Sequence, residues 1–151
     1  MGWKPPVEFE EKQLQGNDGE CDVGPCAKIS LVFPEVTSSP NETATALLQG
    51  KIQEFTRTPI LEEGTAASEE QVIRDFIATY RAILAEEPGY RLAGSSKWTV
   101  KRQATVRYQT SELACVEFLE DLYTGGAHGS TTKRYLIVDL RDGRQIGLAD
   151  M

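Results

Sequence analysis

The spacing of apolar residues predicts strands at the beginning of the chain and two helices after them. Apolar and polar residues alternate over residues 6–14 and again over residues 27–33, a pattern typical of two strands that pair as a hairpin. Gly16-Asn17-Asp18-Gly19 is predicted to end the first strand, and Pro34 limits the second. Apolar positions then recur every three or four residues until Thr58-Pro59, which predicts an amphipathic helix.

Both predicted helices carry sequence signals for their first turn. Ser39 precedes Pro40, and Glu42 lies three residues after Ser39, so we expect a capping box with Ser39 as the N-cap. Ser68 and Gln71 repeat this pattern before a wide apolar stripe that runs until a Pro-Gly pair. The second helix is therefore the more strongly predicted of the two.

After residue 97 the apolar residues recur at every second position, which predicts strands. Five residues of the first strand are predicted to share one side of the sheet: Trp98, Val100, Ala104, Val106 and Tyr108. The predicted strands cover residues 97–108, 113–122, 133–140 and 145–148. The resulting order, β-β-α-α-β-β-β-β, groups strands apart from helices. It predicts an α+β fold in which an antiparallel sheet has two helices packed on one face.

Length and charge narrow the class of protein. A chain of 151 residues with 40% hydrophobic and 26% charged residues fits one folded domain spanning residues 1–151. A net charge of −7 disfavours nucleic acid as a partner and favours a cationic one, with acidic runs at Glu8-Phe9-Glu10-Glu11 and from Glu117 to Asp121. No apolar run is long enough to predict a transmembrane segment. The chain stops directly after strand-like sequence, so we expect a fragment of a longer protein.

The three cysteines allow more than one interpretation. Four residues separate Cys21 from Cys26 within a Gly/Pro turn, a spacing that fits a small disulfide ring and also fits two free thiols. A structural zinc site would need Cys115 and His128 as further ligands, and these lack the paired spacing of such sites, so no metal is predicted. Cys115 lies in a strand pattern and is predicted to be a small buried residue.

The chemistry-bearing residues do not match a catalytic signature. His128 is the single histidine, and nothing beside it resembles a nucleophile or an orienting partner. Glu117, Glu120 and Asp121 could pair as acid and base, but a charged strand face is the simpler explanation of the same residues. We therefore predict that the chain is not an enzyme, with no catalytic residue and no cofactor.

A glycine-rich segment, Tyr123-Thr124-Gly125-Gly126-Ala127-His128-Gly129-Ser130, joins two predicted strands. In one interpretation it is a bend that needs glycine for its backbone path, with His128 satisfying backbone groups. In the other, the connection presents a ligand-contact surface. The residues predicted to contact a ligand are Tyr123, Thr124, Gly125, Gly126, His128 and Gly129.

This segment, with the strand-like Leu113–Leu122 before it and Tyr135–Leu140 and Gly143–Asp150 after it, resembles the PdaC/RsiV-like domain family of bacterial envelope proteins. The resemblance implies a non-catalytic extracytoplasmic module, of the kind that accompanies a peptidoglycan deacetylase domain or forms part of a lysozyme-binding ectodomain. An alternative is an accessory domain of a deacetylase or hydrolase whose catalytic part lies elsewhere.

The resemblance also carries expectations about location and partners. It implies the periplasm or the cell surface, with a native signal peptide or lipid anchor outside this sequence, and therefore favours a bond between Cys21 and Cys26. The partner that it implies is a cationic protein such as lysozyme, or a cell-wall glycan.

Overall fold

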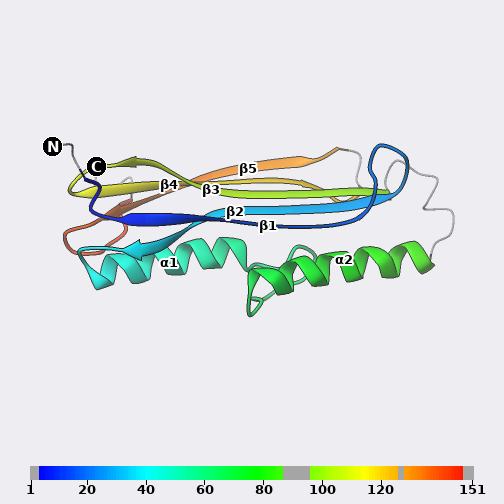
Figure 1. Cartoon of the computed structure of the whole chain (residues 1–151), viewed down its shortest axis with the longest axis horizontal. Coiled ribbons are helices and arrows are strands. Elements are labelled where there is room, and N and C mark those ends of the chain that lie inside the picture. Colours follow the sequence, from blue (N-terminus) through cyan, green and yellow to red (C-terminus); the bar gives the residue numbers. More distant parts are fainter. Residues whose placement is uncertain (1–3, 87–95, 126–127, 148–151) are drawn as a thin grey trace.

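A five-stranded sheet carries two helices along one of its faces (Figure 1). This computed structural model describes residues 4–86, 96–125 and 128–147. In chain order the elements are β1 (Glu8–Gly19), β2 (Cys26–Ser38), α1 (Glu42–Thr56), α2 (Glu69–Glu86), β3 (Lys97–Gln109), β4 (Leu113–Tyr123) and β5 (Ser130–Asp139). The predicted α+β fold with both helices on one face is confirmed.

The strands lie in the sheet in the order in which they occur in the chain, β1-β2-β3-β4-β5. Three of the neighbouring pairs are antiparallel, but β2 and β3 are parallel, with Cys26 opposite Lys97. The prediction of a wholly antiparallel sheet is wrong at this pair. The reason is that α1 and α2 together form a crossover connection, which returns the chain to the same end of the sheet before β3 begins.

The predicted strand over residues 145–148 is also wrong within the part of the chain that the structure describes. The turn at Asp142-Gly143 is present, and Gly143 has a φ of 76°, a left-handed conformation that favours glycine. After the turn, pairing is limited to a single bridge between Val138 and Gln145. Leu148 lies outside the described residues.

The first two strands are longer than predicted. β1 continues through Gly16 to Gly19, and β2 continues through Pro34 to Ser38. β3 pairs with β2 only as far as Val32. Beyond that point β2 has a neighbour on one side only, which is where a strand tolerates the missing N–H of proline.

The helix caps confirm one prediction and correct the other. Asn41, not Ser39, is the N-cap of α1, because its side chain accepts a hydrogen bond from the Ala44 N–H at 3.0 Å. The Asn41 amide group also donates to the Arg141 carbonyl oxygen, so the cap ties α1 to the turn after β5. At α2 the predicted cap is present: Ser68 Oγ accepts from the Gln71 N–H at 3.2 Å.

The core lies between the sheet and the helices. Alternate residues of β2, among them Ile29 and Leu31, are fully buried, as are Leu48 and Ile52 of α1. On α2, the Tyr80 ring meets the Trp98 ring of β3 edge-on, with the centroids 5.3 Å apart. This packing uses the helix-facing side of each strand and leaves the other side of the sheet without helices (Figure 1).

One irregularity in β3 changes which side chains face the core. The register with β4 shifts between Val106 and Tyr108, so Tyr108 pairs with Cys115 and is 59% exposed. The prediction that Tyr108 lies on the same side as Trp98 is therefore wrong, because a bulge reverses the alternation at that point. A second unexpected feature of β3 is Arg102, a buried charged residue at the core-facing position between Val100 and Ala104.

Gly16 lies at a close approach of α2 to β1. A Cβ atom at this position would lie 2.5 Å from Cγ2 of Ile73, a branched methyl that cannot swing away. Gly50, on the exposed side of α1, would meet nothing within 4 Å. The strand interior therefore contains glycine for a packing reason, whereas the helix interior does not need it.

We expect Gly16→Ala to lower the free energy of unfolding by about 1–3 kcal/mol, because the added methyl overpacks the contact with Ile73. The matched control, Gly50→Ala, should raise it by about 0.5–1 kcal/mol through helix propensity. Urea unfolding of both variants measures the two effects. Equal stability of Gly16→Ala and the wild type would contradict the close approach.

Candidate functional site

The predicted ligand-contact segment forms the connection between β4 and β5, after the last strand pair, Leu122 with Ser130. Gly125 has a φ of 95°, which explains a glycine there. Tyr123 and Thr124 are half-buried, whereas His128 and Gly129 are exposed. The His128 ring nitrogen Nδ1 lies 3.3 Å from the Gly129 carbonyl oxygen, which agrees with the interpretation of a bend that His128 helps to satisfy. Gly126 lies outside the described residues, as does Ala127.

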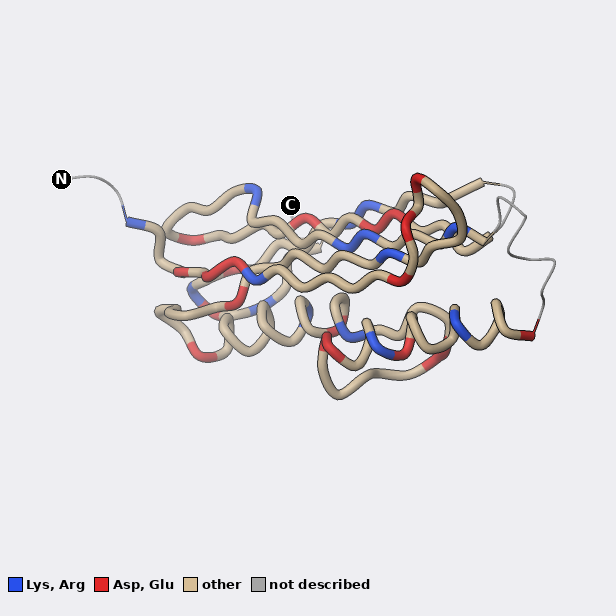
Figure 2. Tube along the Cα trace, turned by 45° about the vertical axis from the view of Figure 1, so that its right-hand side comes forward, with Lys and Arg blue, Asp and Glu red and all other residues tan. Residues whose placement is uncertain are grey.

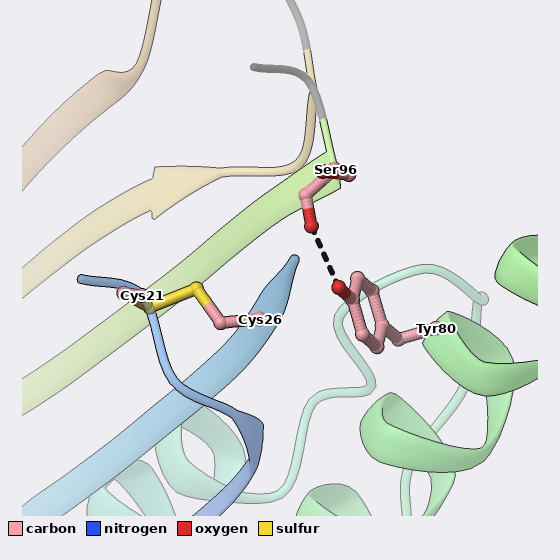
Figure 3. The surroundings of a disulfide bond; sticks show 4 residues. All are labelled: Cys21, Cys26, Tyr80 and Ser96. Carbon is pink, nitrogen blue, oxygen red and sulfur yellow. Dashed lines mark hydrogen bonds between the residues drawn. A yellow bond between two sulfur atoms is a disulfide. The ribbon is translucent and has the colours of Figure 1, made fainter. Parts of the chain in front are cut away.

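The structure joins Cys21 to Cys26 in a disulfide at the turn between β1 and β2 (Figure 3). Cys26 is fully buried and starts the parallel pairing with β3. Close by, the Tyr80 hydroxyl donates a hydrogen bond to the Ser96 carbonyl oxygen at 2.7 Å, which holds α2 to the start of β3 (Figure 3). The disulfide and this hydrogen bond therefore hold the same end of the sheet.

Cys115 is the free cysteine, and it is less buried than predicted. It is half-buried rather than buried, and it lies opposite Ile137 on the sheet face that carries no helix. Burial, with a smaller contribution from the nearby Glu117 carboxylate, raises the pKa of the Cys115 thiol. This thiol is therefore a weaker nucleophile at neutral pH than an ordinary cysteine.

We predict that alkylation of unfolded, unreduced protein modifies Cys115 alone, because the other two sulfurs are bonded to each other. Reduction before alkylation should then give modification at all three cysteines. Peptide mass spectrometry distinguishes the two outcomes. Modification of Cys21 without reduction would contradict the disulfide.

The acidic run from Glu117 to Asp121 does not form one acidic surface. Strand alternation places Glu117 and Asp121 on the helix-free face and Glu120 on the helix-covered face. The Arg107 guanidinium holds Glu117 with contacts of 3.0 and 3.2 Å, and it lowers the pKa of that carboxyl. Arg102 likewise pairs with Glu120, so two of the three carboxylates in this run are compensated by arginines and the run offers little free negative charge to a cationic partner.

Two other carboxylates with lowered pKa values have structural partners. Burial alone would raise the pKa of Glu69, but hydrogen bonds from Arg57 and Thr56 outweigh that effect and lower it. Hydrogen bonds from the Arg141 side chain and backbone lower the pKa of Asp139 from 3.8 to about 2. These groups stabilise the start of α2 and the turn after β5, so their shifted pKa values have structural causes.

The Asp139 carboxylate should make the stability of the protein depend on pH. Its pKa is lower in the folded state, so its contribution is present above the ordinary value of 3.8 and is lost as the pH falls towards 2. We expect the free energy of unfolding, measured with urea, to fall less steeply over that interval in Asp139→Asn than in the wild type. An equal slope in the variant and the wild type would contradict the assignment.

A groove of about 630 Å³ lies where α1 and the start of α2 meet β1 and β2. We call it the acidic groove, and its lining residues that matter here are Lys12, Leu14, Phe33, Glu35, Gln49, Gln53 and Glu70. Leu14 and Phe33 supply apolar surface. The Gln49 side-chain oxygen accepts from the Val36 N–H at 2.9 Å, which fixes the α1 wall against β2. The volume is within the range of about 300–1,000 Å³ of small-ligand pockets.

Negative charge in the acidic groove is only partly compensated. Lys12 pairs with Glu10 at 3.4 Å, and Arg57 pairs with Glu69 at 3.0 Å. Glu35 and Glu70 make no ion pair with any described residue. Glu35 also lies directly opposite Glu10 in the β1–β2 ladder, a like-charge pair that a cation would relieve. Acidic positions gather at the beginning of β1 (Figure 2).

Sequence reasoning did not find this groove. Glu35 and Glu70 are far apart in the chain and belong to no motif, so only the packing of α2 beside β2 brings them together. The sequence does contain a signal for Arg102. It is a charged residue at a core-facing position of an otherwise apolar alternation, a pattern that indicates a buried ion pair.

Comparison with known proteins gives a fold and no assigned activity. No family model matches the chain, and no curated protein matches it. A crystal structure of a DUF3298 family member from Bacteroides fragilis superposes with a TM-score of 0.68 at 19% identity, over 97% of this chain and 62% of the other. A DUF3298 family protein from Pseudomonas aeruginosa gives a TM-score of 0.53 at 25% identity, over 98% of this chain and 57% of the other.

The chain thus has the fold of a domain found in DUF3298 family proteins of bacteria. It spans about three fifths of the length of each of these two proteins. Among the described residues, no helix is both long and apolar enough to span a membrane, and no group of three or more metal-ligating side chains is assembled.

Proposed function

We propose that the chain is a non-catalytic, extracytoplasmic binding module of a bacterial envelope protein, and that its acidic groove receives a basic segment of a partner protein. The observation that carries this proposal is the uncompensated charge of Glu35 and Glu70 in a groove of about 630 Å³. The disulfide supports an oxidising compartment. The fold shared with bacterial DUF3298 proteins and the resemblance to the PdaC/RsiV-like family support an envelope protein.

The lining of the acidic groove suits a lysine or arginine side chain. Such a side chain can lay its apolar stem on Leu14 and Phe33 while its cation reaches Glu35 or Glu70. The amide of Gln53 is available at the same wall for hydrogen bonds to the backbone of the bound segment. The net charge of −7 would also raise the rate at which a cationic protein meets the domain. Lysozyme is the partner of this kind that the family resemblance suggests.

The acidic groove and the glycine-rich connection between β4 and β5 can be tested separately. The groove lies beside β1 and the Tyr123–Gly129 connection lies beside β5, and these strands are the two opposite edges of the sheet. A variant at one edge therefore leaves the other edge intact.

We expect a lysozyme to shift amide resonances of groove residues when it is titrated into isotope-labelled domain. The double variant Glu35→Gln with Glu70→Gln should weaken binding by about 1 kcal/mol, because it removes two partly exposed charge contacts. The control is Glu62→Gln with Glu63→Gln, which makes the same change in net charge in an exposed loop and should have a smaller effect.

Three outcomes would change the proposal. Binding that depends on Tyr123 and not on Glu35 would move the site to the β4–β5 connection. Binding of soluble cell-wall glycan without binding of lysozyme would replace the protein partner. Equal weakening by both double variants would reduce the interaction to general charge attraction, which salt screens at about 0.15 M.

A further inference from the structure

A second, smaller pocket lies between the end of α1 and the strands β3, β4 and β5. Its volume is about 180 Å³. We call it the arginine pocket, and the residues that define it are Phe55, Arg102, Phe118, Glu120, Thr132 and Arg134. It lies on the helix-covered side of the sheet, since Phe118 pairs with Arg134, and Glu120 with Thr132, on that side.

Arg102 is a fixed part of the wall. It is 4% exposed, and its Nε contacts Glu120 Oε2 at 2.6 Å while another guanidinium nitrogen donates to the Thr58 carbonyl oxygen. Its guanidinium carbon also lies 5.9 Å from the centre of the Phe55 ring. The charges of Arg102 and Glu120 therefore neutralise each other, and their positions are held by several contacts.

Arg134 is different, because its charge makes no ion pair within the described part of the chain. It is an exposed residue of β5, and its guanidinium carbon lies 5.9 Å from the centre of the Phe118 ring. Among the described residues, no carboxylate lies within ion-pair distance of it. Stacking on an aromatic ring orients a guanidinium while leaving its N–H groups free to bind an anion.

The charges of the residues that line the arginine pocket indicate the charge of its ligand. Two guanidinium groups face one carboxylate, so the arginine pocket has one positive charge in excess, in a chain whose net charge is −7. One excess positive charge matches a monoanion. A phosphate monoester carries nearly two negative charges at neutral pH and would leave one of them uncompensated beside Glu120. A carboxylate has a single charge and the planar shape that a guanidinium binds with two parallel hydrogen bonds.

The size of the pocket limits the ligand further. At about 180 Å³ it is below the range of about 300–1,000 Å³ in which small-molecule sites enclose a whole ligand. It can receive one small group at the end of a larger molecule. The rings of Phe55 and Phe118 offer apolar contact to the carbon that bears this group, and the Thr132 hydroxyl offers a further hydrogen bond.

We propose that the arginine pocket binds a carboxylate group of a larger ligand, with Arg134 as the residue that contacts it and the Arg102–Glu120 ion pair as a neutral part of the wall. Such a carboxylate can belong to a peptide C-terminus or to an acidic sugar. This site is separate from the acidic groove and does not depend on the function proposed for that groove.

The test uses pairs of probes that differ only in a carboxylate. N-acetylmuramic acid is compared with its carboxamide, and acetyl-Ala-Ala is compared with its amide, by titration into the isotope-labelled full chain. At least one carboxylate is expected to shift the amides of Thr132 and Arg134, and neither uncharged probe should do so. The probe that binds identifies the source of the carboxylate.

Two variants with the same change in charge test the position of the site. Arg134→Gln is expected to weaken binding on the order of tenfold, because it removes a charged hydrogen-bonding partner. Lys133→Gln should change the affinity by no more than about twofold, because Lys133 pairs with Leu119 on the helix-free face. Matching urea midpoints for both variants and the wild type would show that each is folded.

Several results would overturn the proposal. These are the absence of binding by either carboxylate, an equal loss of affinity in Arg134→Gln and Lys133→Gln, or inorganic phosphate binding as tightly as the carboxylates. These results would not contradict the function proposed for the acidic groove, because the lysozyme titration depends on Glu35 and Glu70.

Discussion

The parallel pairing of β2 with β3 is the constraint on which the rest of the fold depends. It joins a β1–β2 hairpin to a β3–β4–β5 meander, and it covers only Cys26 to Val32 against Lys97 to Gln103. Parallel neighbours cannot be linked by a tight turn, so the intervening chain must cross the sheet. That requirement places α1 and α2 one after the other on a single face (Figure 1). The buried Cys26 and the Tyr80–Ser96 hydrogen bond stabilise the end at which this pairing starts.

The same constraint creates both candidate sites. Two helices that follow one another on one face of the sheet leave parts of that face uncovered beside α1 and beyond its end. The acidic groove is the space beside β1, and the arginine pocket is the space beyond the end of α1 over β3, β4 and β5. Each space is lined by side chains that alternate in the strands to face the helices. Charges can lie there because part of each lining reaches solvent, whereas Arg102, which is buried, needs its partner Glu120.

The two sites have opposite charge, and this difference is a local property that net charge does not reveal. The total of −7 indicates a preference for cationic partners, yet Arg134 is a cation without a carboxylate partner among the described residues. Conversely, the run from Glu117 to Asp121 looks acidic in the sequence, but Arg107 and Arg102 already hold two of its carboxylates. Which charges remain free depends on strand register, because register decides which side chains meet.

Local pattern was enough to predict most of the elements. Apolar periodicity located both helices and the strands at residues 97–108 and 113–122, and the Ser68–Gln71 capping signal gave the start of α2. These features depend on residues within one or two turns of each other, so the sequence carries them directly. Ser39 and Asn41 were both local candidates for the N-cap of α1. The residue that caps the helix, Asn41, also donates a hydrogen bond to the distant Arg141 carbonyl oxygen.

Tertiary structure alone decided the parallel pair, the extension of β1 through Gly16, the reversal at Tyr108 and the contents of both pockets. Each of these depends on residues far apart in the chain: Ile73 against Gly16, Cys115 against Tyr108, and Glu70 near Glu35. The sequence by itself determined which segments bury an apolar face. It did not determine which segments meet, because that choice depends on chain connectivity and on side-chain volume at contacts that no local pattern records.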